Sequence, residues 1–371
     1  MKRFLNIFGV RGNGSAAMVP VAALMLAAAP VAHGQDAKAA AAKASKAVAA
    51  PTASAADKRA AQAELEALIK AAKAEGEVVF YAAPTENVNK RVGEAFLKKY
   101  GVRYSFIRAG STQLEQRYST EAEAGNIAAD MMVNAGGASA YVEMANKKGW
   151  TESVSQAGLP VIKSGEFPAR FVTGPTAIVS ISPWLIAYHT GSVTGSDVPR
   201  DWPDLLDAKW KGRILLSNPS VSDAYVDFWG LLYDKYGDSF FTLLKPNLRP
   251  VGTGVQASQG LGAGEGSFLV PAVVAQVMEP KSKGAPLDMV MLPFTTGVEQ
   301  HIVLTLRSKA KHPNAARLFA NFTMSQEGNK IFNDDPGGFT IYEPSKLPKE
   351  YQSPKPGAAA RREAITKLLG F

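Results

Sequence analysis

Between residues 78 and 144 the sequence repeats one pattern three times: a short apolar run, a loop of small or hydroxylated residues, and a segment with apolar residues at helical spacing. The predicted strands are residues 78–81, 103–108 and 130–133. Successive strand–loop–helix units favour a mainly parallel, doubly wound α/β sheet. Ligands of such sheets bind beyond the carboxyl ends of the strands, so the loops after these strands are candidate site segments.

A long apolar stretch at residues 177–188 interrupts this rhythm, and further strands are predicted at residues 214–216, near 290 and at 302–306. We interpret the chain as two doubly wound α/β lobes joined by a hinge of two crossings, which would let a cleft close. A single large α/β domain with a long loop is the alternative. Lobe 1 is assigned to residues 63–177 and 293–371, and lobe 2 to residues 178–292. Within lobe 1, residues 358–371 are expected to form an amphipathic helix or a frayed tail.

The first 34 residues have the features of an export signal. A basic start with Lys2, Arg3 and Arg11 precedes an apolar run over residues 16–32 and small residues at the expected cleavage site. A membrane anchor is the alternative, but the run is shorter than the roughly 20 apolar residues of a spanning helix and contains two prolines. Residues 35–62 are rich in Ala, Lys and Ser and predict a low-complexity linker, mobile or partly helical.

The chain contains no cysteine, which excludes disulfides, thiol catalysis and a lipid-modified cysteine anchor. We therefore expect a free periplasmic protein that is stabilised by burial alone. The net charge of +8 lies mostly before residue 63, and the rest of the chain holds 33 basic and 31 acidic residues. Because a nucleic-acid-binding protein needs a concentrated basic face, we expect no nucleic-acid partner.

Motifs of enzymes are not found. There is no Gly-x-Ser-x-Gly elbow, and the glycine-rich run at residues 252–266 has neither Gly-x-Gly-x-x-Gly nor a Gly-Lys-Ser/Thr ending. The four histidines have no metal-ligand spacing. The sequence therefore predicts neither catalytic residues, nor a metal site, nor a cofactor.

Several short motifs occur in the order known from one family. They are Gly76–Tyr81, Ala129-Asp130 with Lys148–Trp150, Trp202–Leu206 with Trp210–Gly212, Lys283–Pro286, Lys311–Ala316 and Phe322–Gly328. As an ordered set the chain resembles the periplasmic solute-binding proteins of ABC transporters, in the ferric-ion and related-solute group. The resemblance implies the type II periplasmic-binding-protein fold, capture of a solute without chemistry, and an ABC permease in the inner membrane as partner.

The ferric ligands of that group are absent at the matching positions. The resemblance implies a histidine after the first strand, a carboxylate after the third and two adjacent tyrosines in lobe 2. Here these positions fall on Thr85, Ala135, Val274 and Ala275. A hard trivalent cation needs anionic oxygen donors, so a copy of the ferric site is not expected. A shifted tyrosine such as Tyr225 remains an alternative metal ligand.

Two predicted helix starts are expected to face each other across the cleft, at residues 110–112 and 218–222. Free N–H groups and hydroxyls at helix starts form anion cradles, although ordinary N-capping is the alternative. An apolar wall is expected at residues 268–274, or else a buried strand. Tyr81 and Trp184 belong to the cleft wall or to the core. The candidate ligand-binding residues are Tyr81, Thr85, Ser111, Thr112, Asn134, Gly136, Trp184, Asn218, Ser220, Ser222, Phe268 and Pro271.

These features predict a monomer that binds a small organic anion, a carboxylate or a phosph(on)ate, in an interlobe cleft. Two alternatives stay open. One is a protein that takes ferric iron through a bound anion or chelator, and the other is a sensor subunit that presents its ligand to a histidine kinase.

Overall fold

A computed structural model describes residues 53–135, 138–335, 338–355 and 357–371. The predicted export signal, most of the predicted linker and Gly136 lie outside these residues. No helix in the described part of the chain has both the length and the apolar character of a membrane span.

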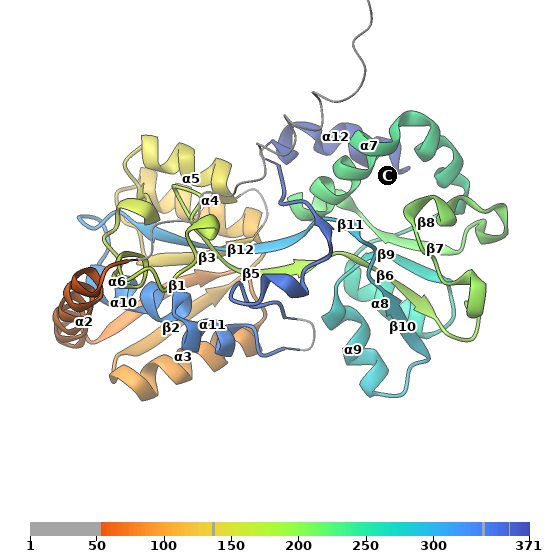
Figure 1. Ribbon diagram of the computed structural model, residues 1–371. Helices are drawn as coiled ribbons and strands as arrows, with labels where there is room; N and C mark the ends of the chain where they lie inside the picture. Colours follow the sequence, from red (N-terminus) through yellow and green to blue (C-terminus); the bar gives the residue numbers. More distant parts are fainter. Residues whose placement is uncertain (1–52, 136–137, 336–337, 356) are drawn as a thin grey trace, which may run out of the picture. The chain divides into compact units, whose positions relative to one another are not determined.

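Lobe 1 is built on a six-stranded sheet with the order β2-β1-β3-β12-β4, in which β5 also pairs with β12 (Figure 1). Strands β1, β2 and β3 are parallel, and β12 runs antiparallel to β3, β4 and β5. The three predicted strand–loop–helix units are therefore confirmed. The strands are β1 Glu77–Ala82, β2 Arg103–Arg108, β3 Met131–Ala135, β4 Thr151–Glu152, β5 Ala177–Pro183 and β12 Gly297–Thr305.

Glycines end helices in lobe 1. Gly76 and Gly101 end α2 and α3 with φ values of 82° and 72°, a conformation that costs glycine little. The helices are α2 Ala55–Glu75, α3 Glu86–Tyr100, α4 Ser111–Glu123, α5 Ala138–Lys147, α6 Pro160–Lys163, α10 Pro313–Met324 and α11 Gln326–Phe332.

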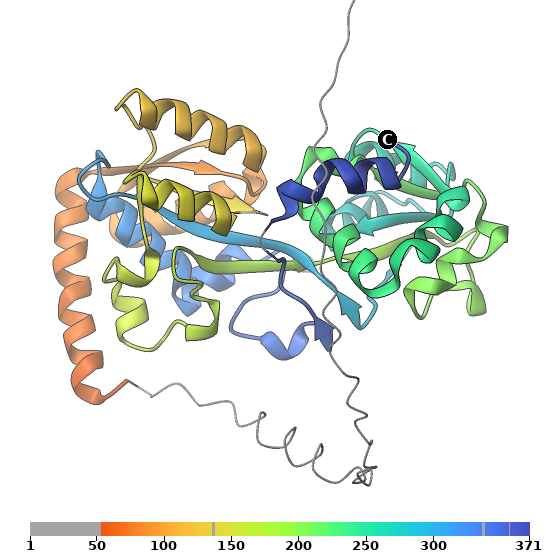
Figure 2. The same ribbon diagram turned by 90° about the horizontal axis from the view of Figure 1, so that it is seen from above.

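Helix α2 begins eight residues before the predicted start of lobe 1, inside the predicted linker. Ser54 and Asp57 form a reciprocal capping box that fixes its first turn. The helix lies along α10 at the edge of the lobe (Figure 2), and Ala61 and Ala72 are buried there. Residues 55–62 are thus part of a packed helix.

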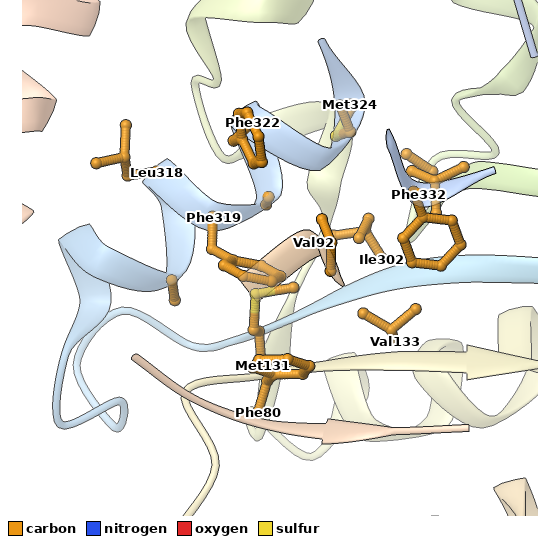
Figure 3. Packing of buried hydrophobic residues seen from close by; sticks show 14 of the residues in the cluster. Phe80, Val92, Met131, Val133, Ile302, Leu318, Phe319, Phe322, Met324 and Phe332 are labelled. Atoms are coloured by element: carbon orange, nitrogen blue, oxygen red, sulfur yellow. The ribbon is translucent and has the colours of Figure 1, made fainter. Parts of the chain in front are cut away.

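The core of lobe 1 lies between the sheet and α10, whose residues from Ala315 to Met324 are all buried. Figure 3 shows Phe319 pointing toward Met131 and Phe80 of the sheet. The ring centroids of Phe319 and Phe80 are 4.7 Å apart.

Lobe 2 has a five-stranded sheet with the order β10-β6-β9-β7-β8. Strands β7, β8 and β9 are parallel, whereas β6 is antiparallel to β9 and β10. Its strands are β6 Leu185–His189, β7 Ile214–Ser217, β8 Leu248–Val251, β9 Phe268–Ala272 and β10 Leu287–Val290, and its helices are α7 Asp223–Leu244, α8 Gly254–Gly262 and α9 Val274–Ser282.

The two sheets are connected at two places. The chain leaves the first sheet at the end of β5 and enters the second at β6, with only Trp184 between them. It returns between β10 and β12 through β11 (Phe294–Thr295), which pairs with β13 (Glu350–Tyr351). The first crossing lies within the apolar stretch at residues 177–188 that interrupts the strand–loop–helix pattern. Strand β5 nevertheless belongs to lobe 1, because it pairs with β12 from end to end. Lobe 1 therefore extends six residues beyond the assigned boundary at residue 177.

The assignment of the C-terminal residues to lobe 1 is corrected by the structure. Helix α12 (Ala358–Leu368) packs beside α7 of lobe 2, as Figures 1 and 2 both show. Its buried residues Ala358 and Ile365, and Leu369 directly after it, join the apolar core of that lobe.

Candidate functional site

A cavity of about 230 Å³ is lined by residues of both lobes. Its lining comes from the loop between β1 and α3, from the hinge strands β5 and β12, from the start of α9, and from the segment that follows α11. The lining residues are Ala83, Pro84, Thr85, Val88, Ser180, Ser182, Pro183, Val273, Val274, Ala275, Val298, Gln300, Phe332, Asn333, Asp335 and Gly338. A second cavity, between α7 and the C-terminal segment, has about 40 Å³ and is too small for an organic ligand.

Three of the four positions that the family resemblance matched to ferric ligands line this cavity. Thr85, Val274 and Ala275 line it. Ala135 is the register partner of Gln300, which also lines it. None of the four side chains has an anionic oxygen. The described residues also contain no group of three or more His, Cys, Asp or Glu side chains that could hold a metal ion.

Two helices begin at the cavity, one in each lobe. The Thr85 side chain, at the N-cap of α3, makes no capping hydrogen bond within the described residues. Val273, at the N-cap of α9, has no side-chain acceptor, although its own N–H donates to Gln276 Oε1 at 3.1 Å. The first N–H groups of a helix have no partner inside the helix, and they carry a partial positive charge. The cavity therefore has a positive helix end on each side.

These are not the two helix starts that the sequence analysis selected. At the start of α4, Ser111 Oγ accepts a hydrogen bond from the Ala135 N–H at 3.2 Å. At the start of α7, Ser222 Oγ accepts from the Ala224 N–H at 3.3 Å, and Asn218 Oδ1 accepts from the Ser220 N–H at 2.9 Å. Thr112 and Ser220 are exposed. The structure thus places Asn218 and Ser222 in local capping contacts, and Ser111 in a contact with the end of β3.

An acidic residue begins α7, and another lies in the second turn of α4. Asp223, the first residue of α7, accepts a hydrogen bond from Arg362 Nη2 at 2.5 Å. Burial raises the pKa of Glu115 in α4 to about 7, and the charge of Asp223 adds to the shift. The two starts are therefore close enough to interact, but a carboxylate already occupies the first turn of α7.

The remaining candidate residues are buried in the two cores. Tyr81 donates a hydrogen bond to Glu121 at 2.5 Å, and burial raises its pKa to about 12. Asn134 Nδ2 donates to Glu115 at 2.7 Å. Trp184 stacks on Tyr225 with ring centroids 5.0 Å apart. Phe268 and Pro271 are buried in β9, where Phe268 packs edge-on against Trp210.

Of the twelve candidate residues, Thr85 is the one that the described lining contains. The predicted site residues did not include Ser180, Ser182, Gln300 and Asn333. Ser180 and Ser182 are two residues apart in an otherwise apolar strand, and this alternation is a signal for a polar face. Gln300 and Asn333 have no comparable local signal, because Gln300 reaches the cavity through the order of the sheet and Asn333 through the packing of α11.

The chain is similar in sequence to known bacterial proteins. The family described as bacterial extracellular solute-binding protein matches residues 78–336. An uncharacterized protein of Haemophilus influenzae is 27% identical over 321 residues, which is 79% of this chain and 90% of that protein.

Solved structures of periplasmic binding proteins share the fold. The protein AfuA from Actinobacillus pleuropneumoniae, with exogenous fructose-6-phosphate bound, is 22% identical with a TM-score of 0.60, covering 79% of this chain and 97% of AfuA. Iron-bound HitA from Pseudomonas aeruginosa is 16% identical with a TM-score of 0.63, covering 80% and 99%. The Atu4243-GABA receptor is 17% identical with a TM-score of 0.60, covering 78% and 95%. These likenesses confirm the type II periplasmic-binding-protein fold.

Proposed function

Because the chain belongs to the family of bacterial extracellular solute-binding proteins of ABC import systems, we propose that it binds a small organic anion in the 230 Å³ cavity. The secreted protein would then deliver this anion from the periplasm to an ABC permease in the inner membrane. The carboxylate or phosphate group lies between the starts of α3 and α9. Ligand capture involves no chemical change.

The observation that carries this proposal is the presence of two helix starts at one cavity. Each offers unpaired N–H groups and a partial positive charge, which favour an anion. The first turn of α3 contains Glu86, but Lys90 lies 2.6 Å from its carboxylate. The charged residue in the lining, Asp335, is likewise paired with Arg91 at 2.9 Å. The cavity therefore has positive helix ends without an unpaired carboxylate in its described lining.

The apolar side of the cavity suits the carbon skeleton of such a ligand. Val88, Val273, Val274 and Val298 lie in the lining beside the polar groups. A volume of about 230 Å³ is below the range of drug-sized pockets, which favours a small metabolite. Fructose-6-phosphate bound to AfuA is an organic anion held by a protein of the same fold.

The hinge connects binding to transport. Ser180, Ser182 and Gln300 lie on β5 and β12, the strands that lead to the two crossings. A ligand that contacts these strands and α9 together would favour the closed arrangement of the lobes, since it interacts with both sides of the hinge. The permease would recognise that closed form.

The first test is ligand binding by the protein from residue 35 onward, measured by thermal shift and by calorimetry. A ligand at a hundredfold excess over its Kd adds about 2.7 kcal/mol to the free energy of unfolding. We expect organic phosphates or carboxylates to raise the Tm, and their uncharged analogues to have little effect. Stabilisation by Fe(III) alone would contradict the proposal, and stabilisation by Fe(III) only with citrate would favour the iron–chelate alternative.

The second test places a competing charge at the start of α9. Ala275 is exposed and lies in the first turn, where a carboxylate stabilises a helix. Ala275→Glu should therefore keep the fold but weaken anion binding by about tenfold or more through charge repulsion. Ala360→Glu, in the first turn of α12, is the matched control and should bind like the wild type. Equal affinities of the two variants for the anion would show that the start of α9 does not contribute to the binding site.

A further inference from the structure

The polar side chains that line the cavity are uncharged apart from Asp335. They are the hydroxyls of Thr85, Ser180 and Ser182 and the amides of Gln300 and Asn333. Asp335 is paired with Arg91. In the described lining, therefore, nothing charged is free to pair with a second charge on the ligand.

The two amides have oxygens that lack donors. Gln300 Oε1 and Asn333 Oδ1 are both buried and have no hydrogen-bond partner among the described residues. Asn333 is 8% exposed, and its Nδ2 donates to the Val179 and Asn329 carbonyls at 2.9 Å each. These two bonds fix the amide orientation, so the oxygen is the unpaired atom.

Gln300 lies in the sheet of lobe 1, on a strand that has a neighbour on each side. On β12 it is paired in register with Ala135 of β3 on one side and with Ser180 of β5 on the other. A buried acceptor without a donor destabilises a structure, and a ligand that supplies the donor recovers that loss. Since both oxygens are shielded from solvent, a small rearrangement of the lining on binding must bring the donor to them.

The type of donor follows from the charge of the lining. An ammonium group would be buried without a free carboxylate, which is more costly than burial of a neutral donor. An unsubstituted hydrocarbon chain would leave both oxygens unpaired. Hydroxyl groups satisfy neutral acceptors without an added charge.

On the basis of the proposed anion site, we infer that the ligand is a hydroxylated organic anion, such as a polyol phosphate or a hydroxy acid. Its hydroxyls donate to Gln300 and Asn333, and its anionic group lies at the helix starts. Gln300 and Asn333 are then specificity-determining residues, which select for hydroxyls independently of the anionic group.

The test compares ligands that differ in one group at a time, by calorimetry with the protein from residue 35 onward. Glycerol 3-phosphate and propyl phosphate share the phosphate but differ in hydroxyls, and O-phosphoethanolamine carries an ammonium group. Glycerate and propionate share a carboxylate and likewise differ in hydroxyls. Ribose 5-phosphate tests a longer hydroxylated phosphate. We expect each hydroxylated anion to bind about tenfold more tightly than its deoxy partner, which corresponds to about 1.4 kcal/mol.

A variant separates this selection from folding. Gln300→Met keeps the length of the side chain and removes its hydrogen-bonding groups. It should bind glycerol 3-phosphate about tenfold less tightly while leaving propyl phosphate unchanged, because only the hydroxylated ligand loses a partner. Gln259→Met, at an exposed position of α8, is the control and should keep the wild-type preference.

The outcomes distinguish the two proposals. Equal binding of the hydroxylated and deoxy anions, preference for O-phosphoethanolamine, or failure of every hydroxylated anion to bind would overturn the inference. If glycerol or ribose bound as tightly as their phosphates, the proposed anion site would be wrong. The inferred selection for hydroxyl groups would not be affected by that result.

Discussion

Phe319 shows how a single side chain stabilises lobe 1. It is fully buried on α10, and its ring lies 4.7 Å from Phe80 of β1 and 4.9 Å from Phe96 of α3. The sheet, α3 and α10 therefore meet at one ring. Aromatic pairs at such distances add to the free energy that burial provides. The same sheet holds Ser180 and Gln300 in the cavity, so this packing also positions the site.

Replacement of this ring tests its contribution. Phe319→Ala should lower the free energy of unfolding by about 3–5 kcal/mol, because it removes buried area and leaves a cavity. The measurement is urea unfolding followed by circular dichroism. Leu243, which is 60% exposed, provides the control, and Leu243→Ala should change stability by about 0.5 kcal/mol or less. Similar losses for the two variants would contradict the assigned role of Phe319.

Helix α12 shows how one element completes lobe 2. Its apolar side packs on α7, and two arginines pair with carboxylates of that helix. Arg361 Nη2 donates to Asp234 at 2.8 Å, and Arg362 Nη2 donates to Asp223 at 2.5 Å. Since both pairs are partly exposed, solvent screens them, and the apolar contacts contribute most of the stability.

Truncation of the apolar side of α12 should therefore affect stability more than removal of an exposed charge. Ile365 is 3% exposed, and Ile365→Ala should cost about 2–4 kcal/mol. Lys367 in the last turn is exposed, and Lys367→Ala should cost about 0.5 kcal/mol or less. Thermal unfolding monitored by tryptophan fluorescence would report on lobe 2, where Trp202 and Trp229 are buried. An unchanged Tm for Ile365→Ala would show that α12 does not stabilise the lobe.

In the whole molecule, burial favours the neutral form of several ionisable groups. Burial raises the pKa of Glu115 and that of Asp227 to about 7, and the charge of Asp223 adds to both shifts. Burial also lowers the pKa of His301 to about 4. The raised carboxyl groups stabilise the folded state at low pH, and this stability is lost as the pH rises through about 7. The lowered histidine acts in the opposite direction, since its contribution is lost as the pH falls from 6.5 toward 4.

Between pH 6.5 and about pH 8 the stability lost through the two carboxyl groups exceeds the remaining gain from His301, so the Tm should fall there. Asp227→Asn should reduce this fall, because asparagine stays neutral in the same buried place. Asp334→Asn, at an exposed position, should keep the wild-type slope. Thermal unfolding between pH 6.5 and about pH 8 measures how the Tm changes with pH in the wild type and in the two variants. A wild-type slope in Asp227→Asn would show that Asp227 does not contribute.

Local patterns in the sequence were sufficient for the elements and the fold class. Strand β2 has the predicted bounds, and β1 extends the predicted residues by one at each end. Such elements follow from short-range physics, since apolar spacing selects strand or helix and glycines such as Gly76 and Gly101 end helices. The ordered motifs likewise predicted the type II fold, through the family resemblance that they carry.

The site and the place of α12 were decided only by the tertiary structure. Thr85 and Gln300 are more than 200 residues apart in sequence, and they meet because β12 pairs with β3 in the sheet that also contains β1. The helix starts that share the cavity are those of α3 and α9, although α4 and α7 have more suggestive hydroxyl-rich starts. Strand order and helix packing are long-range choices among many compatible local patterns, so sequence periodicity alone does not contain them.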